Sequence, residues 1–454
     1  MCNQYILKEI FFLRQKNSTK PNLSVLLLIH LQLINIITGP DIILKFLGFR
    51  YDDVAEIGLG WFTFSVNFLF ILLGVFVLLN NKTKSLKLIL EVKKIGFFLV
   101  LIFLSSFLVL ENLFEQSLNL IFLTIGYSIK ICSLIILFDK YNIEFSSILL
   151  KVLKILMIVM LVYLVIFFGN GFSTTLIGRY QSVFNQPNTL GQFSSLAIAT
   201  LFSERLYISR KNKKFNNYSF FFFLSTAIAF VIISQSFTNF LLIILIVLMY
   251  FFYVLKNKML HVLLLVSIAL FSFFFFTNSK DLSFLSFSDV NVTSSNFNRD
   301  LTLTGRTQIW RDVLDKVQFD DKTLCGYGIG GFWGKTGAPS SKIDNALFAE
   351  IGQSHNGMID LYTQYGLVGI SLFVYILFTI LKKLSKLKSN SAQVIFLNFF
   401  FVLFLFNNLV ESSYLQPKNF LNIIFILNTI YILNPKYLLE FRKAILNAIN
   451  ISQS

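Results

Sequence analysis

The sequence predicts an all-α, polytopic integral membrane protein with about twelve transmembrane helices and one long extracytoplasmic loop that carries short helices. Three observations predict this class. Of the 454 residues, 55% are hydrophobic and only 14% are charged, whereas soluble domains carry roughly 25% charged residues. Uncharged apolar runs recur along the chain, as at Leu99–Val109, Phe240–Leu255 and Val394–Phe406. Lysine and arginine are distributed unevenly between the segments that join such runs.

The expected spans follow from the lengths of the apolar stretches, because a helix needs about 20 residues to cross the hydrocarbon core. In chain order they cover residues 24–44, 61–80, 95–111, 117–138, 147–168, 189–203, 218–234, 238–255, 259–277, 358–381, 393–410 and 419–433. The chain, 1–454, is then a single transmembrane domain, and residues 278–357 form the long extracytoplasmic loop within it.

The placement of the basic residues explains the net charge of +16. If the N-terminus is cytoplasmic, the cytoplasmic segments hold most of the lysines and arginines. The short outer loops then keep only Lys45, Arg50, Arg179 and Lys418. This asymmetry is the positive-inside pattern of membrane proteins. We therefore expect both termini in the cytoplasm, basic side chains at anionic lipid headgroups, and no nucleic-acid partner.

The long loop contains an amphipathic helix after a stretch rich in Ser, Asn and Asp. The apolar side chains of this helix repeat at helical spacing and lie on one stripe, formed by Ile309, Trp310, Val313, Leu314 and Val317. Arg306 lies on the same face, in the first turn. Beside a membrane, such an arginine is either an anchor to lipid phosphate or a ligand for an anionic substrate.

Three glycines in the loop, Gly326, Gly328 and Gly331, have the GxGxxG spacing of dinucleotide-binding proteins. No strand is expected before them, no helix is expected to open from them, and their predicted location is extracytoplasmic. A dinucleotide site is therefore excluded. We expect instead that these glycines allow a tight turn or the close approach of a ligand.

His355 differs from the other two histidines, His30 and His261, because it lies at the predicted outer boundary rather than inside an apolar span. Beside Asn356, at the start of a helix, its imidazole either accepts a proton from a hydroxyl group or caps and anchors the helix. The other nearby bases are carboxylates, whose charge would repel a bound phosphate: Asp344, Glu350 and Asp360. The spacings of His, Cys and carboxylate residues predict no metal site, and the three cysteines are scattered.

Four segments, in order, resemble motifs of the O-antigen ligase and polymerase superfamily. The run His355-Asn356, nine residues and Gly366-Leu367-Val368-Gly369 is similar to its His-Asn-x9-Gly-x-x-Gly signature. The other three resemble its GR…W segment, its GxGxG turn and its R…NPN…G segment, and are Gly305–Trp310, Gly326–Gly330 and Arg179–Gly191. In the last of these, Gln186 replaces the first Asn. The matches cover residues 179–370.

The resemblance implies a glycosyltransferase that moves a glycan from undecaprenyl diphosphate to a hydroxyl acceptor, at the outer face of the bacterial cytoplasmic (inner) membrane and without a metal or other cofactor. It implies that His355 is the catalytic base and that Arg306 is a catalytic cation for the diphosphate. The substrate-binding residues that it implies are Arg179, Asn188, Asn356 and Gly328. The implied partners are the lipid-linked oligosaccharide, membrane lipids and a chain-length regulator protein.

The chain departs from the family at one place. The family commonly carries an arginine after a Ser-rich turn, where this chain reads Ser234-Gln235-Ser236-Phe237-Thr238-Asn239. Either Arg179 takes over that role or diphosphate binding differs. The departure favours a polymerase of O-antigen or capsule repeat units over a ligase that transfers finished chains to lipid A core. A protein O-oligosaccharyltransferase is less favoured, because no soluble domain follows residue 433, and so is a flippase or transporter, because the one clearly intramembrane cation is Lys130.

Overall fold

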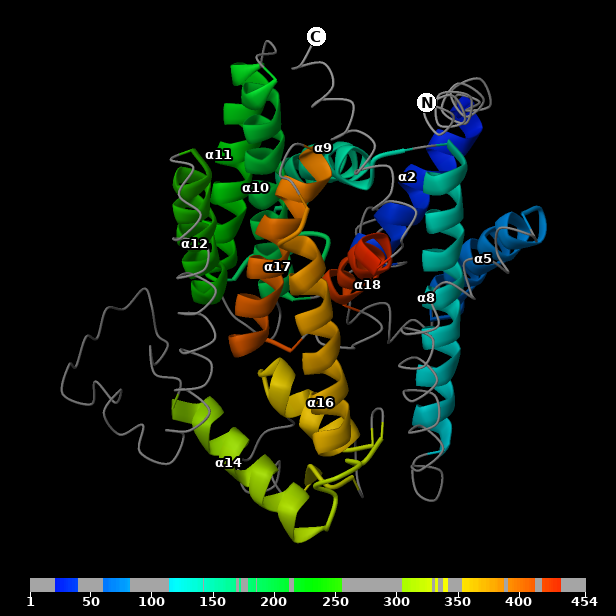
Figure 1. The fold of residues 1–454 in the computed structure, drawn as a ribbon, viewed down its shortest axis with the longest axis vertical. Coiled ribbons are helices and arrows are strands. Elements are labelled where there is room, and N and C mark those ends of the chain that lie inside the picture. The colour runs from blue at the N-terminus through cyan, green and yellow to red at the C-terminus, as the bar shows by residue number, and fades with distance from the viewer. Residues whose placement is uncertain are drawn as a thin grey trace, which may run out of the picture. The chain divides into compact units, whose positions relative to one another are not determined.

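The described part of the chain is helical throughout (Figure 1). The computed structural model describes residues 21–39, 60–81, 114–141, 143–168, 171–172, 179–184, 186–211, 216–254, 304–328, 331–333, 338–341, 353–387, 391–412 and 419–433. These residues contain no strand, only one isolated bridge between Phe172 and Tyr180. The helices are α2 (Leu23–Thr38), α5 (Gly60–Leu79), α8 (Phe114–Tyr141), α9 (Phe145–Ile166), α10 (Pro187–Arg210), α11 (Asn217–Ser234), α12 (Phe237–Val254), α14 (Thr304–Phe319), α16 (Gly357–Leu384), α17 (Ala392–Val410) and α18 (Phe420–Leu433).

The prediction of an all-α membrane protein is confirmed for these residues. Every described helix except α14 coincides with an expected span. Among the described helices, four are long and apolar enough to cross a membrane: Phe145–Ile166, Asn217–Ser234, Gly357–Leu384 and Ala392–Leu409. The expected spans 95–111 and 259–277 lie outside the described residues, as does much of the loop 278–357, so the number of twelve spans stays a prediction.

The chain divides into two compact units. Unit 1 comprises Met1–Glu91, Ile125–Ile243 and Lys388–Phe400. Unit 2 comprises Val92–Thr124, Ile244–Leu387 and Phe401–Ser454. Each unit is assembled from separate stretches of sequence, so its internal contacts join residues that are far apart in the chain.

The centre of unit 1 is α10, which contacts α9 and α11. Pro187 begins this helix at a position where a missing N–H costs no helical hydrogen bond. Ser194, Ser195 and Ala197 are fully buried, and such small side chains allow close helix packing in a membrane. The helices α10 and α11, both green in Figure 1, pack against each other.

Lys130 joins three helices of unit 1. Its ammonium group on α8 donates to the amide oxygen of Asn35 on α2 at 2.8 Å and to that of Asn67 on α5 at 2.9 Å. The lysine is only 2% exposed. An intramembrane cation normally faces a partner or a pathway, and the partners of this one are the two amide oxygens. Lys130 is therefore a link between helices.

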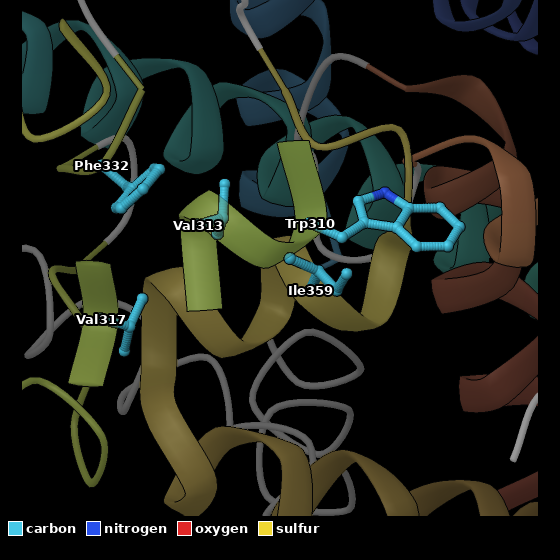
Figure 2. Packing of buried hydrophobic residues seen from close by; sticks show 5 residues of the cluster. All are labelled: Trp310, Val313, Val317, Phe332 and Ile359. Carbon is cyan, nitrogen blue, oxygen red and sulfur yellow. The ribbon is translucent and has the colours of Figure 1, made fainter. Parts of the chain in front are cut away.

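In unit 2, α14 packs against α16 through an apolar cluster (Figure 2). The cluster consists of Trp310, Val313, Val317, Phe332 and Ile359, each at most 2% exposed. The first three belong to the predicted apolar stripe of α14, so that stripe is confirmed as the buried face. Ile359 lies in the first turns of α16, and the cluster therefore attaches α14 to the start of α16.

A break at Gly366 divides α16 into two segments. The backbone there has φ 62° and ψ −160°, a region that is essentially restricted to glycine. A break leaves backbone groups without helical partners, and the turn 323–328 supplies the partners instead. Four hydrogen bonds connect the two backbones: Tyr327 N to Thr363 O at 2.8 Å, Gly328 N to Gln364 O at 2.8 Å, Leu367 N to Thr323 O at 2.9 Å, and Val368 N to Leu324 O at 3.2 Å.

The two backbones cross at a pair of glycines. A Cβ at Gly326 would lie 2.5 Å from the carbonyl carbon of Gln364, and one at Gly366 would lie 2.3 Å from the carbonyl group of Leu324. Gly326 also has a positive φ of 68°. The expectation of a tight turn and a close approach is thus confirmed at Gly326, where the approaching group is protein backbone. We call this crossing of 323–328 over Gly366 the glycine joint.

Candidate active site

His355 lies in a short, tightly held segment directly before α16. Its φ of 57° is unusual for a residue with a side chain, and such strained positions cluster at functional sites. The cap of the helix is the next residue, Asn356, whose side-chain oxygen accepts from the backbone N–H of Met358 at 3.0 Å and of Ile359 at 3.2 Å. Because Asn356 supplies the cap, the imidazole of His355 is not needed for it.

Contacts from three directions fix the backbone around His355. Trp310 of α14 donates its indole N–H to the carbonyl of Ser354 at 2.8 Å. Asp360 of α16 accepts from the backbone N–H of Ser354 at 3.0 Å and from the indole of Trp333 at 2.8 Å. Asn356 donates to the carbonyl of Leu409, near the end of α17, at 3.2 Å. The position of His355 is thus determined by α14, α16 and α17 together.

Asp360, one of the alternative bases considered from the sequence, is fully buried. Its contacts to Ser354 and Trp333 give it a structural role in the segment. The other two alternatives, Asp344 and Glu350, lie outside the described residues. His355 is more accessible, since its side chain is 32% exposed.

Glu411 brings the two expected catalytic residues together. It follows the last residue of α17, and its carboxylate contacts the side chains of both residues through different oxygens. The guanidinium Nη2 of Arg306 lies 3.2 Å from Oε1, and the imidazole Nδ1 of His355 lies 3.4 Å from Oε2. The amide nitrogen of Gln353 also lies 3.3 Å from Nδ1 of His355. Arg306 and His355, expected in one site, are therefore neighbours through a shared carboxylate.

The electrostatics of this triad favour a charged Glu411. Burial alone would raise the pKa of its carboxyl group, since the side chain is only 6% exposed. The hydrogen bond to His355 and the positive charge of Arg306 act in the opposite direction, and together they hold the pKa below the usual glutamate value. Glu411 is therefore a buried carboxylate in contact with two more exposed side chains, Arg306 at 27% and His355 at 32% exposure.

Glu411 is the residue that sequence reasoning missed. It is a single acidic residue at the end of the expected span 393–410, and the predicted topology places that end on the same outer side as His355. This shared side of the membrane was the sequence signal that could have placed Glu411 near His355. Among the described residues, no three His, Cys, Asp or Glu side chains are close enough together to hold a metal ion.

Arg179 and Asn188 belong to unit 1, whereas Arg306, His355 and Glu411 belong to unit 2. Arg179 is 3% exposed, donates from Nε to the carbonyl of Ser234 at 3.0 Å, and donates from Nη2 to the side chain of Asn188 at 2.7 Å. Ser234 is the last residue of α11, where the helix dipole favours a cation. Arg179 thus contacts the turn that lacks the family's arginine.

Gly328 contributes a backbone role. Its φ is 83°, and its N–H donates to Gln364 within the glycine joint. The substrate contacts expected for Gly328, Asn356, Asn188 and Arg179 stay predictions.

A comparison with protein families gives one match. Residues 220–374 match the family model described as O-antigen ligase (Wzy_C). No curated protein matches the chain. The matched segment begins within α11, includes α12, α14, the glycine joint and His355, and ends within α16. The resemblance to the O-antigen ligase and polymerase superfamily is therefore confirmed over this segment.

Proposed function

We propose, from the premise that residues 220–374 match the O-antigen ligase family model, that this protein is a lipid-linked-sugar glycosyltransferase of the bacterial cytoplasmic membrane. Its reaction transfers a glycan from undecaprenyl diphosphate to a sugar hydroxyl on the outer face, and its product is a longer O-antigen or capsule chain. The observation that carries the proposal is the grouping of an imidazole and a guanidinium around one buried carboxylate.

The reaction needs a base for the acceptor and a cation for the donor. The acceptor oxygen forms a bond to the anomeric carbon of the donor sugar, and the bond from that carbon to the diphosphate oxygen breaks. The diphosphate leaves with the electron pair, and the hydroxyl proton goes to the imidazole of His355. Nδ1 of His355 faces Glu411, so Nε2 is the nitrogen that accepts the proton.

Arg306 carries the positive charge nearest to His355 among the described contacts. A guanidinium fork matches phosphate oxygens in two-point contacts, which a lysine ammonium cannot reproduce. Charge on the leaving diphosphate grows in the transition state, so a fixed cation there lowers the barrier. Arg306 is 27% exposed and therefore accessible to such a group.

Polymerisation is favoured over ligation because the turn Ser234–Asn239 lacks the arginine expected of the family, and Arg179 donates to Ser234 instead. The alternative is a ligase with a lipid A core acceptor. Transport is less favoured, since Lys130 is engaged by Asn35 and Asn67.

The test uses the purified protein in lipid vesicles with lipid-linked repeat units as the only glycan. Growth of chains from donor alone identifies a polymerase, and growth only after lipid A core is added identifies a ligase. His355→Ala and His355→Gln should bind donor but lower the transfer rate by roughly 10²- to 10⁴-fold, the usual contribution of a positioned base.

His30→Ala is the matched control, because His30 hydrogen-bonds only to its own helix, at the carbonyl of Leu26, in the described contacts. This variant should transfer glycan at the wild-type rate. Normal transfer by both His355 variants would remove His355 from the mechanism. Absence of transfer by wild-type protein with either acceptor would refute the proposed function.

A further inference from the structure

The carboxylate of Glu411 uses its two oxygens for two different side chains, which neutralisation of Arg306 alone would not require. One oxygen contacts Arg306 and the other contacts His355, at 3.2 and 3.4 Å. The carboxylate is 6% exposed, whereas the side chains of Arg306 and His355 are about five times more exposed, at 27% and 32%. An incoming anion therefore meets Arg306 and His355 before it meets Glu411.

A diphosphate group competes with Glu411 for Arg306. It offers more negative charge than one carboxylate, and its oxygens match the guanidinium fork. Each contact that Arg306 makes to the donor weakens its attraction to Glu411, because the same positive charge is shared. The charge of Glu411 then acts on His355 with less competition from Arg306.

We infer that Glu411 is a positioning residue through which donor binding activates the base: the diphosphate draws Arg306 away from Glu411, and the freed carboxylate then orients and strengthens His355 as proton acceptor. This inference rests on the proposed function. It assigns the Arg306–Glu411 contact to the resting state, and it makes His355 most effective only when a donor is bound. Hydroxyl activation without a donor is thereby suppressed.

The effect on His355 follows from elementary electrostatics. A carboxylate that accepts from Nδ1–H fixes the tautomer in which Nε2 has the free lone pair. The same negative charge stabilises the imidazolium that forms as the proton arrives. A second cation on the carboxylate reduces both effects, so removal of Arg306 increases them.

The other groups around His355 do not replace Glu411. Asp360, from α16, is occupied by Ser354 and Trp333 and reaches the segment through the backbone N–H of Ser354. Gln353 contacts Nδ1 but carries no charge. In the described contacts, the charged groups that act on His355 are Glu411 from the end of α17 and, through it, Arg306 from α14.

Glu411→Gln separates this inference from a purely structural role. The amide keeps the size of the side chain but no longer competes for Arg306, so we expect the dissociation constant for lipid-linked donor to fall by roughly 3- to 10-fold. Turnover at saturating donor should nevertheless fall by roughly 10- to 10³-fold, since His355 loses its orienting charge. Binding and turnover thus change in opposite directions.

Glu411→Asp provides a second readout. It keeps the negative charge beside His355, so its turnover at saturating donor should exceed that of Glu411→Gln.

Glu144→Gln is the matched control, because Glu144 is another carboxylate, partly buried, that accepts from the backbone N–H of Gln393 in unit 1. It should change neither donor affinity nor turnover. Weaker or unchanged donor binding by Glu411→Gln, or unchanged turnover, would overturn the inference. If His355→Ala is inactive at the same time, the proposed function stands and only the role of Glu411 is lost. If His355→Ala is active, the proposed mechanism itself is refuted.

Discussion

Substitution of Gly366 by alanine should open the glycine joint. The residue has φ 62° and ψ −160°, and an added Cβ would lie 2.3 Å from the backbone carbonyl of Leu324. Backbone strain of this kind costs about 1–3 kcal/mol. The Cβ also forces 323–328 away, and each buried backbone group that loses its partner costs about 1–3 kcal/mol more. With one such group lost, we expect Gly366→Ala to lower the stability of the joint by about 2–6 kcal/mol.

Gly39 provides a control with the same backbone strain and no clash. Its φ is 76° and its ψ is 177°, and nothing lies within 4 Å of an added Cβ. Gly39→Ala should therefore cost only the strain, about 1–3 kcal/mol. The difference between the two variants isolates the contact between the backbones.

The assay combines thermal unfolding in detergent with limited trypsin digestion. Lys322 is exposed and directly precedes the turn, so an open joint should accelerate cleavage after this residue. Gly366→Ala should show both a lower apparent Tm than Gly39→Ala and faster cleavage at Lys322. Equal Tm losses in the two variants, with equal cleavage rates, would refute the reasoning.

Two further predictions concern topology and unit 1. Cys325 is exposed, so a membrane-impermeant thiol reagent should label it in intact cells. The control variant Cys325→Ser should lose that label. Labelling of Cys325 only after the cells are permeabilised would contradict an extracytoplasmic loop. Arg179→Ala removes the hydrogen-bond donors to Ser234 and Asn188 and should destabilise unit 1 by about 2–4 kcal/mol. A thermal unfolding scan measures this loss, and Arg179→Lys should restore only part of it. An unchanged Tm of Arg179→Ala would show that the two hydrogen bonds are dispensable.

Local periodicity predicted the helices well, because burial and lipid contact impose patterns on short stretches of sequence. The stripe of α14 is an example: Trp310, Val313 and Val317 are all buried, as their spacing predicted. The break in α16 was not predicted. The span 358–381 reads as continuous and apolar, and only the backbone of the turn 323–328 determines the conformation of Gly366.

The candidate site was predicted in part for the same reason. Arg306 and His355 stand out because each is an unusual residue beside an apolar stretch. Glu411 is separated from them by 105 and 56 positions, and no local pattern encodes a contact of that range. For Asn356, the sequence predicted only a substrate contact. The structure shows that its side-chain oxygen also caps α16.

The glycine joint has a consequence for how the protein can change over generations. Its four hydrogen bonds join main chain to main chain, so they do not depend on which side chains flank them. Leu324, Leu367 and Val368 are 64%, 46% and 46% exposed. Exchange of these three residues for other apolar residues should therefore leave the joint intact, whereas mutation of either Gly326 or Gly366 should not. The side chains on the surface of the joint can thus vary during evolution while the backbone crossing itself is retained.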